Sequence, residues 1–208
     1  VFFICKEHEG NLIEFIRKEF PVILLKKNKN KKVFKSNNNY QKNLGWTQEE
    51  DASETLKVLK ENKIFNFSFL IVDHYSLDKK WETIIQNHFK FSADKNKLCL
   101  VIDDLFNREH YCDYVLDQNL ISINNPYKNL VSNSTKFLLG PNYALLSNDY
   151  SFYRNQIKNV NPEKNILVFF GGIDKNKLTL KVVEILLQKN LDNISIDIIL
   201  GKNNVEIN

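Results

Sequence analysis

The stretch FNFSFLIVDHYSLDKKWETIIQNH, residues 65–88, decides the fold class of this chain. Its first part, Phe65–Val72, is almost continuously apolar, which predicts a parallel strand that is buried on both faces. Its second part, Leu77–His88, carries an apolar stripe at helical spacing, and Ser76 is placed to cap its first turn. A buried strand that leads directly into a helix is the unit from which parallel α/β sheets are built.

The same alternation of strands and helices continues on both sides of this stretch. We expect an α/β fold in which residues 1–145 form a Rossmann-like N-terminal domain with a parallel sheet. The further strands are predicted at Val1–Cys5, Val22–Leu25, Leu98–Ile102 and Tyr114–Leu116, and the further helices at Asn11–Phe20 and at Glu49–Asn62, which Thr47 can cap.

The pattern restarts near the end of the sequence, after a polar, Asn-rich stretch from residue 122 to 148. We expect a linker over residues 146–164 and the start of a second Rossmann-like domain over residues 165–208. Two strands and one helix bury too little surface to stand alone, so we expect this domain to be incomplete and the chain to be a fragment. The predicted elements are a strand at Asn165–Phe170, a tight turn at Gly171–Gly172, a helix at Leu178–Lys189 and a strand at Ile194–Leu200.

Composition and charge argue against several classes of protein. With 43% apolar and 26% charged residues, the 208-residue chain has the composition of a globular domain, and its apolar runs are far shorter than a membrane-spanning helix needs. The 29 basic and 25 acidic residues leave a net charge of +4, and the excess lies mainly in Lys26–Lys35. Arginine, which nucleic-acid readers favour, occurs only at Arg17, Arg108 and Arg154. We expect neither nucleic acid nor a membrane as a partner.

The cysteines and the first residues point to the cytoplasm. Cys5, Cys99 and Cys112 are odd in number and lack CxxC spacing, which argues against a disulfide framework and against a zinc site built from cysteines. The opening VFFICKEHEG lacks the basic start and long apolar middle of a signal peptide. We therefore expect a cytoplasmic protein.

Three reactive side chains, Asp73, His74 and Tyr75, follow the Phe65–Val72 strand. In open parallel sheets the ligand crevice lies beyond the C-terminal ends of the strands. His74 can exchange a proton near neutral pH, and an adjacent carboxylate can fix its tautomer. The alternative is structural, with Asp73 capping the next helix and His74 satisfied by its neighbours.

Two further segments could bind ligands. Asp103 and Asp104, at the end of the next strand, could hold a divalent cation, cap a turn or pair with Arg108. No third ligand stands at a diagnostic spacing, so we expect no metal. Gly171–Gly172 can present backbone N–H groups to a phosphate, with the dipole of the following helix adding attraction, or can be an ordinary strand-to-helix turn.

Four blocks in a fixed order resemble the nucleotide-sugar hydrolases of the pseudaminic acid pathway. They are VDHYSLDKKWE (72–82), VIDDLFNREHYCDYVLDQNL (101–120), LLGPNYALL (138–146) and ILVFFGGIDKNKLTLKVVEILL (166–187). The resemblance implies a GT-B-like architecture, in which the nucleotide sugar lies between two Rossmann-like domains. It also implies that water removes UDP from UDP-2,4-diacetamido-2,4,6-trideoxy-β-L-altropyranose, without a metal or other cofactor.

The resemblance also assigns residues. It implies catalytic roles for Tyr75 and Asp73, and substrate-binding roles for Tyr75, His74, Gly171, Gly172, Asp174 and Gly201. The family's GxGHxxR loop, whose histidine is the proposed base, has no counterpart in this chain, so we expect the chain by itself to hydrolyse nothing measurable. The sequence leaves two alternatives open, which are a non-catalytic nucleotide-sugar-binding module and a GT-B glycosyltransferase.

Overall fold

The structure is a computed structural model that describes residues 1–8, 10–26, 44–121, 125–157, 165–174, 176–189, 191 and 193–201. The chain divides into two compact units, residues 1–145 and residues 146–208. The basic run beyond Lys26 and the expected linker from residue 158 to 164 lie outside the described residues.

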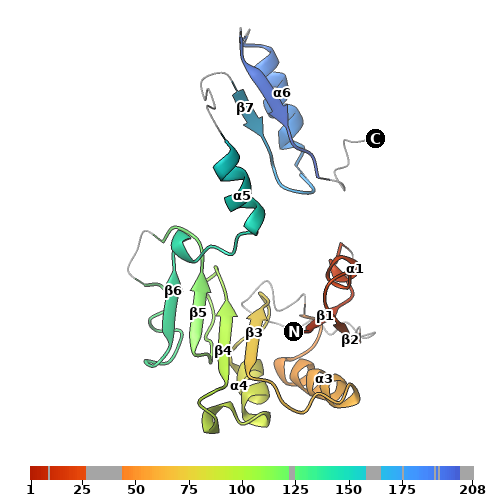
Figure 1. The fold of residues 1–208 in the computed structure, drawn as a ribbon, viewed down its shortest axis with the longest axis vertical. Coiled ribbons are helices and arrows are strands. Elements are labelled where there is room, and N and C mark those ends of the chain that lie inside the picture. The colour runs from red at the N-terminus through yellow and green to blue at the C-terminus, as the bar shows by residue number, and fades with distance from the viewer. Residues whose placement is uncertain are drawn as a thin grey trace. The chain divides into compact units, whose positions relative to one another are not determined.

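A four-stranded parallel sheet lies at the centre of the first unit (Figure 1). Each neighbouring pair of its strands is parallel, which confirms the predicted α/β, Rossmann-like class. The last of these strands lies in the polar, Asn-rich stretch from residue 122 to 148, where no strand was predicted. A run of four residues is too short to show a period. The strand order is β3 (Phe69–Asp73), β4 (Leu98–Ile102), β5 (Tyr114–Asp117) and β6 (Lys136–Leu139).

A second, two-stranded parallel sheet joins β1 (Phe3–Lys6) to β2 (Val22–Leu25). The segment between them forms only one helical turn, α1 (Ile13–Ile16), in place of the longer helix predicted. Leu12 and Phe15 are exposed, so little tertiary packing supports a longer helix there. The next helix, α3 (Gln48–Glu61), is capped by Thr47 as predicted, and the Glu50 side chain completes a capping box by accepting from the Thr47 N–H.

The helix after β3 begins later than predicted. Helix α4 (Lys79–His88) is capped by Asp78, whose side chain accepts a hydrogen bond from the Lys80 N–H. Ser76 lies in the turn that precedes the helix, where its N–H donates to Nδ1 of His74 and its carbonyl accepts from Gln48, and the N-cap position falls on Asp78. The predicted Ser76 cap is therefore wrong.

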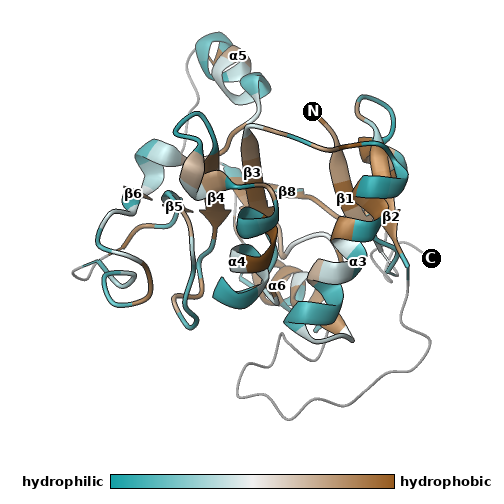
Figure 2. Cartoon of the chain, turned by 90° about the horizontal axis from the view of Figure 1, so that it is seen from below, coloured by the Kyte–Doolittle hydropathy of each residue, from teal (hydrophilic) through white to brown (hydrophobic). Residues whose placement is uncertain are grey.

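The hydrophobic core lies on one face of the four-stranded sheet. Val72, Val101 and Val115, which neighbour one another in register, pack there with Trp81 and Ile85 of α4. Figure 2 shows β3 and β4 in the brown of apolar residues.

The opposite face of β3 is open. Phe69 and Ile71 are 64% and 58% exposed, so the prediction that this strand is buried on both faces is wrong. An apolar run shows that a strand is apolar on both sides, but not whether another element covers each side.

The second unit contains one parallel βαβ motif. Strands β7 (Asn165–Val168) and β8 (Ser195–Ile198) pair in parallel, and α6 (Leu178–Leu187) connects them. Residues expected to belong to the linker form α5 (Asn148–Gln156), with Ser147 as its N-cap. Its aromatic residues are exposed, so it lacks the apolar stripe by which helices are recognised in a sequence. Among the described residues, each helix is too short or too polar to cross a bilayer.

Candidate functional site

The candidate site lies at the C-terminal ends of β3 and β4. Asp73, the last residue of β3, is in register with Ile102, the last residue of β4, and Asp104 follows two positions later. The Tyr75 hydroxyl lies 3.4 Å from Oδ2 of Asp104, to which it donates a hydrogen bond. Two of the predicted site residues, Asp73 and Tyr75, thus share a neighbour that the sequence analysis considered as a cation ligand, a turn cap or a partner of Arg108, but not as part of this site.

The carboxyl groups of Asp73 and Asp104 influence each other. Desolvation raises the pKa of Asp73, and the Asp104 carboxylate raises it further because ionising both groups brings two like charges together. Both Asp73 and Tyr75 are exposed, so a bound molecule can reach them. A carboxyl group with a raised pKa beside a phenol can exchange a proton with a polar ligand.

His74 belongs to a different cluster, although it stands between Asp73 and Tyr75 in the sequence. Desolvation lowers the pKa of His74, Asp51 opposes this, and the cation of Lys6 adds to the lowering. The imidazole Nδ1 lies 3.1 Å from the Ser76 N–H, from which the neutral ring can accept a hydrogen bond. In that tautomer Nε2 carries the proton, so the ring can donate a hydrogen bond to a ligand.

A buried ion pair, which the sequence analysis missed, lies beside His74. Lys6, the last residue of β1, pairs with Asp51 of α3, and Asp51 also accepts a hydrogen bond from the Trp81 indole N–H over 3.0 Å. In the sequence both charges look like surface residues. The one available signal is position, since Asp51 falls on the buried side of the predicted helix, one residue before Ala52.

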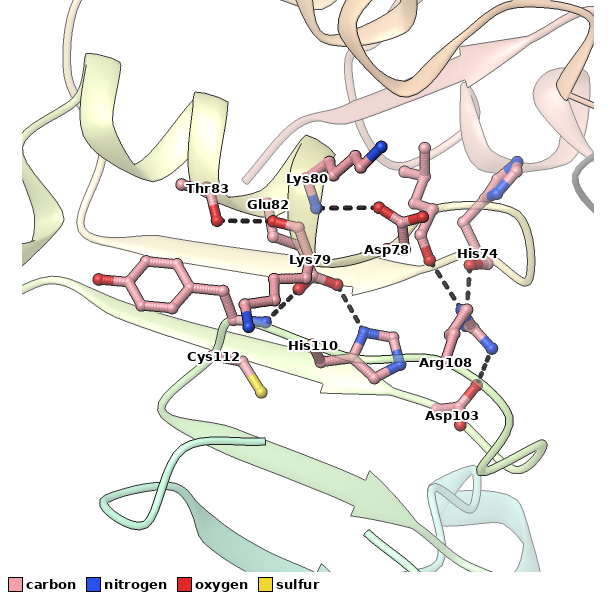
Figure 3. Close-up of polar contacts among 12 residues, drawn as sticks. His74, Asp78, Lys79, Lys80, Glu82, Thr83, Asp103, Arg108, His110 and Cys112 are labelled. Carbon is pink, nitrogen blue, oxygen red and sulfur yellow. Dashed lines mark hydrogen bonds and ion pairs between the residues drawn. The ribbon is translucent and has the colours of Figure 1, made fainter. Parts of the chain in front are cut away.

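Further polar contacts join buried side chains of β4, α4 and the segment that follows β4 (Figure 3). Asp103 pairs with Arg108 over 2.6 Å and caps the following turn, accepting from two backbone N–H groups. Both structural alternatives for Asp103 are thus confirmed. Glu82 of α4 contacts the Nδ1 atom of His110 over 2.7 Å, and both side chains are fully buried.

These contacts bear on metals and redox chemistry. Because Arg108 and the turn amides occupy Asp103, only Asp104 of that pair faces outward. Across the part of the chain that the structure describes, no three His, Cys, Asp or Glu side chains come together as metal ligands. The cysteines are free, and burial raises the pKa of both Cys99 and Cys112, which makes their thiols unreactive.

In the second unit, Gly172 and Gly201 meet where β7 and β8 end. A Cβ atom on Gly201 would lie 2.0 Å from the carbonyl oxygen of Gly172, so only glycine fits there. Gly171 has φ +78°, a left-handed conformation that glycine adopts easily, and it forms the predicted turn. The structure therefore places three of the predicted binding residues at one end of the motif.

Asp174, the fourth of these, contacts the start of α6. Its two carboxylate oxygens accept hydrogen bonds from the N–H groups of Leu178 and Thr179, at 2.9 and 2.8 Å. The hydrogen bonds from Thr179 hold the pKa of Asp174 below its usual range. The first amides of the helix are thus already occupied, so any phosphate at this turn would have to use the N–H groups of the glycines.

No protein-family model matches the sequence. The chain is 29% identical over 187 residues to an uncharacterized protein of Methanocaldococcus jannaschii. The match covers 71% of this chain and 38% of that protein, so the chain spans less than half of the relative's length.

Proposed function

We propose that this chain is part of a nucleotide-sugar hydrolase that releases UDP from UDP-2,4-diacetamido-2,4,6-trideoxy-β-L-altropyranose. The observation that carries the proposal is the group formed by Asp73, Tyr75 and Asp104 at the C-terminal ends of two parallel strands. Such an edge is where open α/β sheets bind ligands. The four sequence blocks supply the substrate class.

The proposed reaction needs a water molecule, a proton acceptor and a place for the leaving group. The water oxygen forms a bond to the anomeric carbon while the bond from that carbon to the phosphate oxygen breaks. A base takes the proton from the water, and UDP leaves with the bonding electrons. In this scheme the base is the histidine of the GxGHxxR loop that the resemblance implies for the full-length protein. Tyr75 orients the water or a sugar hydroxyl, and Asp73 exchanges a proton with a polar group of the sugar.

The arrangement of charge favours a sugar over a diphosphate at this group. Two carboxyl groups repel phosphate, whereas hydroxyl and acetamido N–H groups can donate hydrogen bonds to them. The turn at Gly171–Gly172 has N–H groups and no side chain, so it is the proposed position of the diphosphate. The resemblance of the four sequence blocks is the ground on which we also propose a GT-B-like architecture. We propose that the reaction is cytoplasmic.

The test is UDP release from this sugar nucleotide by the full-length protein. We expect turnover that EDTA does not abolish, and we expect Tyr75→Phe to reduce kcat at an unchanged melting temperature. Tyr143→Phe is the matched control, because the two tyrosines are 45% and 44% exposed and Tyr143 lies outside the group. UDP release that depends on a sugar acceptor would instead identify a glycosyltransferase, and binding without turnover a non-catalytic module.

A further inference from the structure

Arg108 is the most heavily bonded side chain near the candidate site. It is 7% exposed, and its guanidinium contacts two different strand ends. Its Nε donates to the Leu77 carbonyl over 2.8 Å, and its Nη2 donates to the His74 carbonyl over 3.3 Å. Its Nη1 lies 2.6 Å from Oδ1 of Asp103 (Figure 3).

Asp103, the partner of Arg108, is itself held from several sides. Its Oδ2 accepts from the N–H groups of Leu105 and Phe106, and its own N–H donates to the Leu116 carbonyl over 3.0 Å. Its carbonyl accepts from the Tyr127 hydroxyl over 2.9 Å. Asp103 is therefore a fixed point that is joined to the neighbouring strand.

Two of the exposed residues of the site, Tyr75 and Asp104, lie between residues that these bonds hold. Tyr75 stands between His74 and Leu77, whose carbonyls Arg108 binds. Asp104 stands directly between Asp103 and Leu105, which a side-chain hydrogen bond connects. Side chains on loops keep a defined separation only when their backbone is held in this way.

We propose that Arg108 is a positioning residue that sets the spacing between the Asp73–Tyr75 segment and Asp104. A guanidinium suits this task, because its planar fork can bind two carbonyls and a carboxylate at once, which an ammonium group cannot do in the same geometry. That this spacing matters for turnover rests on the proposed function. That Arg108 sets the spacing does not depend on the proposed function.

The variant Arg108→Lys tests the proposal, because it keeps the positive charge and removes the fork. The 208-residue chain is labelled with ¹³C-aspartate, and the carboxyl resonance of Asp73 is followed by NMR as the pH is changed. The resonance that is missing in Asp73→Asn is assigned to Asp73. If Asp104 is no longer held beside Asp73, the titration midpoint of Asp73 should fall toward its ordinary value, because one of the two causes that raise it is weakened. The control is Arg17→Lys, in which an exposed arginine paired with Glu14 changes in the same way and the midpoint stays.

A folded Arg108→Lys chain with an unchanged Asp73 midpoint would overturn the proposal. If that variant does not fold, as judged by circular dichroism, Tyr127→Phe decides. It changes no charge at neutral pH and removes the hydroxyl that bonds both the Asp103 carbonyl and a carboxylate oxygen of Asp117, so the Asp73 midpoint should fall in the same direction. An unchanged midpoint in a folded Tyr127→Phe chain would equally overturn the proposal.

Kinetics on the full-length protein separate this proposal from the proposed function. Arg108→Lys should lower kcat about tenfold to a hundredfold with KM changed less than about twofold, since displaced catalytic groups impair the chemical step. If the unmodified protein releases no UDP, the proposed function fails, and the Asp73 titration alone decides on the positioning role. If it releases UDP and Arg108→Lys leaves kcat unchanged, Arg108 does not position the catalytic groups.

Discussion

The variant Glu82→Gln should destabilise the first unit strongly. The Glu82 carboxylate is fully buried and has two partners, the His110 ring and the Tyr111 backbone N–H. Glutamine keeps the shape of the side chain but removes the charge. Its amide NH₂ then replaces one of the two carboxylate oxygens, so it faces either the His110 ring or the Tyr111 N–H. Hydrogen bonds to a charged group contribute about 1.5–3 kcal/mol each and neutral ones about 1 kcal/mol, so we expect a loss of about 3 kcal/mol.

Thermal unfolding followed by circular dichroism measures this loss. For a unit of this size about 3 kcal/mol corresponds to a melting temperature lowered by about 10 °C. The control is Glu109→Gln, which removes a carboxylate that is exposed and paired only with exposed Lys79. We expect Glu109→Gln to leave the melting temperature unchanged.

A double variant isolates the pair itself. With His110→Ala already present, Glu82→Gln should cost less than it does alone, because the contact with the ring is already lost. The reasoning would be refuted if Glu82→Gln lowered the melting temperature no more than Glu109→Gln does. If Glu82→Gln lowered the melting temperature equally in the presence and in the absence of His110, the two side chains would not stabilise each other, which would also refute the reasoning.

Three further predictions concern Tyr75 and Asp73 of the first unit and Gly201 of the second. Tyr75→Phe should reduce turnover of the full-length protein and leave the melting temperature unchanged, because the ring is already partly in water; the reverse pattern would indicate a structural tyrosine. Since the pKa of Asp73 is higher in the folded chain than in the unfolded one, its contribution to stability is greatest below the unfolded pKa and is lost as the pH rises. Asp73→Asn should thus raise the melting temperature at pH 7 and have little effect near pH 3, and a larger gain at low pH would contradict the shift. Gly201→Ala should lower the melting temperature of the second unit, because overpacking against backbone costs about 1–3 kcal/mol, whereas Gly172→Ala, whose Cβ would meet nothing within 4 Å, should be tolerated.

The sequence predicted those elements whose signals are local. The strand Leu98–Ile102 has the predicted bounds, and the capping box at Thr47 marks the start of α3 correctly. Strand β6 and helix α5 were not found, since the first is short and the second buries no residue. Periodicity reports an amphipathic face, and neither element has one long enough to detect.

The candidate site was predicted in part, because some of its residues have a local signal and others do not. Strand ends can be recognised locally, so Asp73 and Tyr75 were found. The contact of Tyr75 with Asp104 and the separate surroundings of His74 depend on which elements lie side by side. The spacing of residues along the sequence does not show this. Arg108 was considered as a partner of Asp103, but its bonds to the loop after β3 come from a contact 31 residues away in the sequence.

The division of the first unit into two sheets has a consequence for hydrogen exchange. Among the described residues, no backbone hydrogen bond connects β1 and β2 to the sheet of β3 to β6. Side chains connect β1 and β2 to the rest of the unit, through the pair that Lys6 forms with Asp51 of α3 and the apolar contacts of Ile4 and Ile23 with the shared core. The pair β1–β2 can therefore open without breaking any bond of the larger sheet. Its amides should exchange with a lower opening free energy than those of β4, which has a hydrogen-bonded strand on each side.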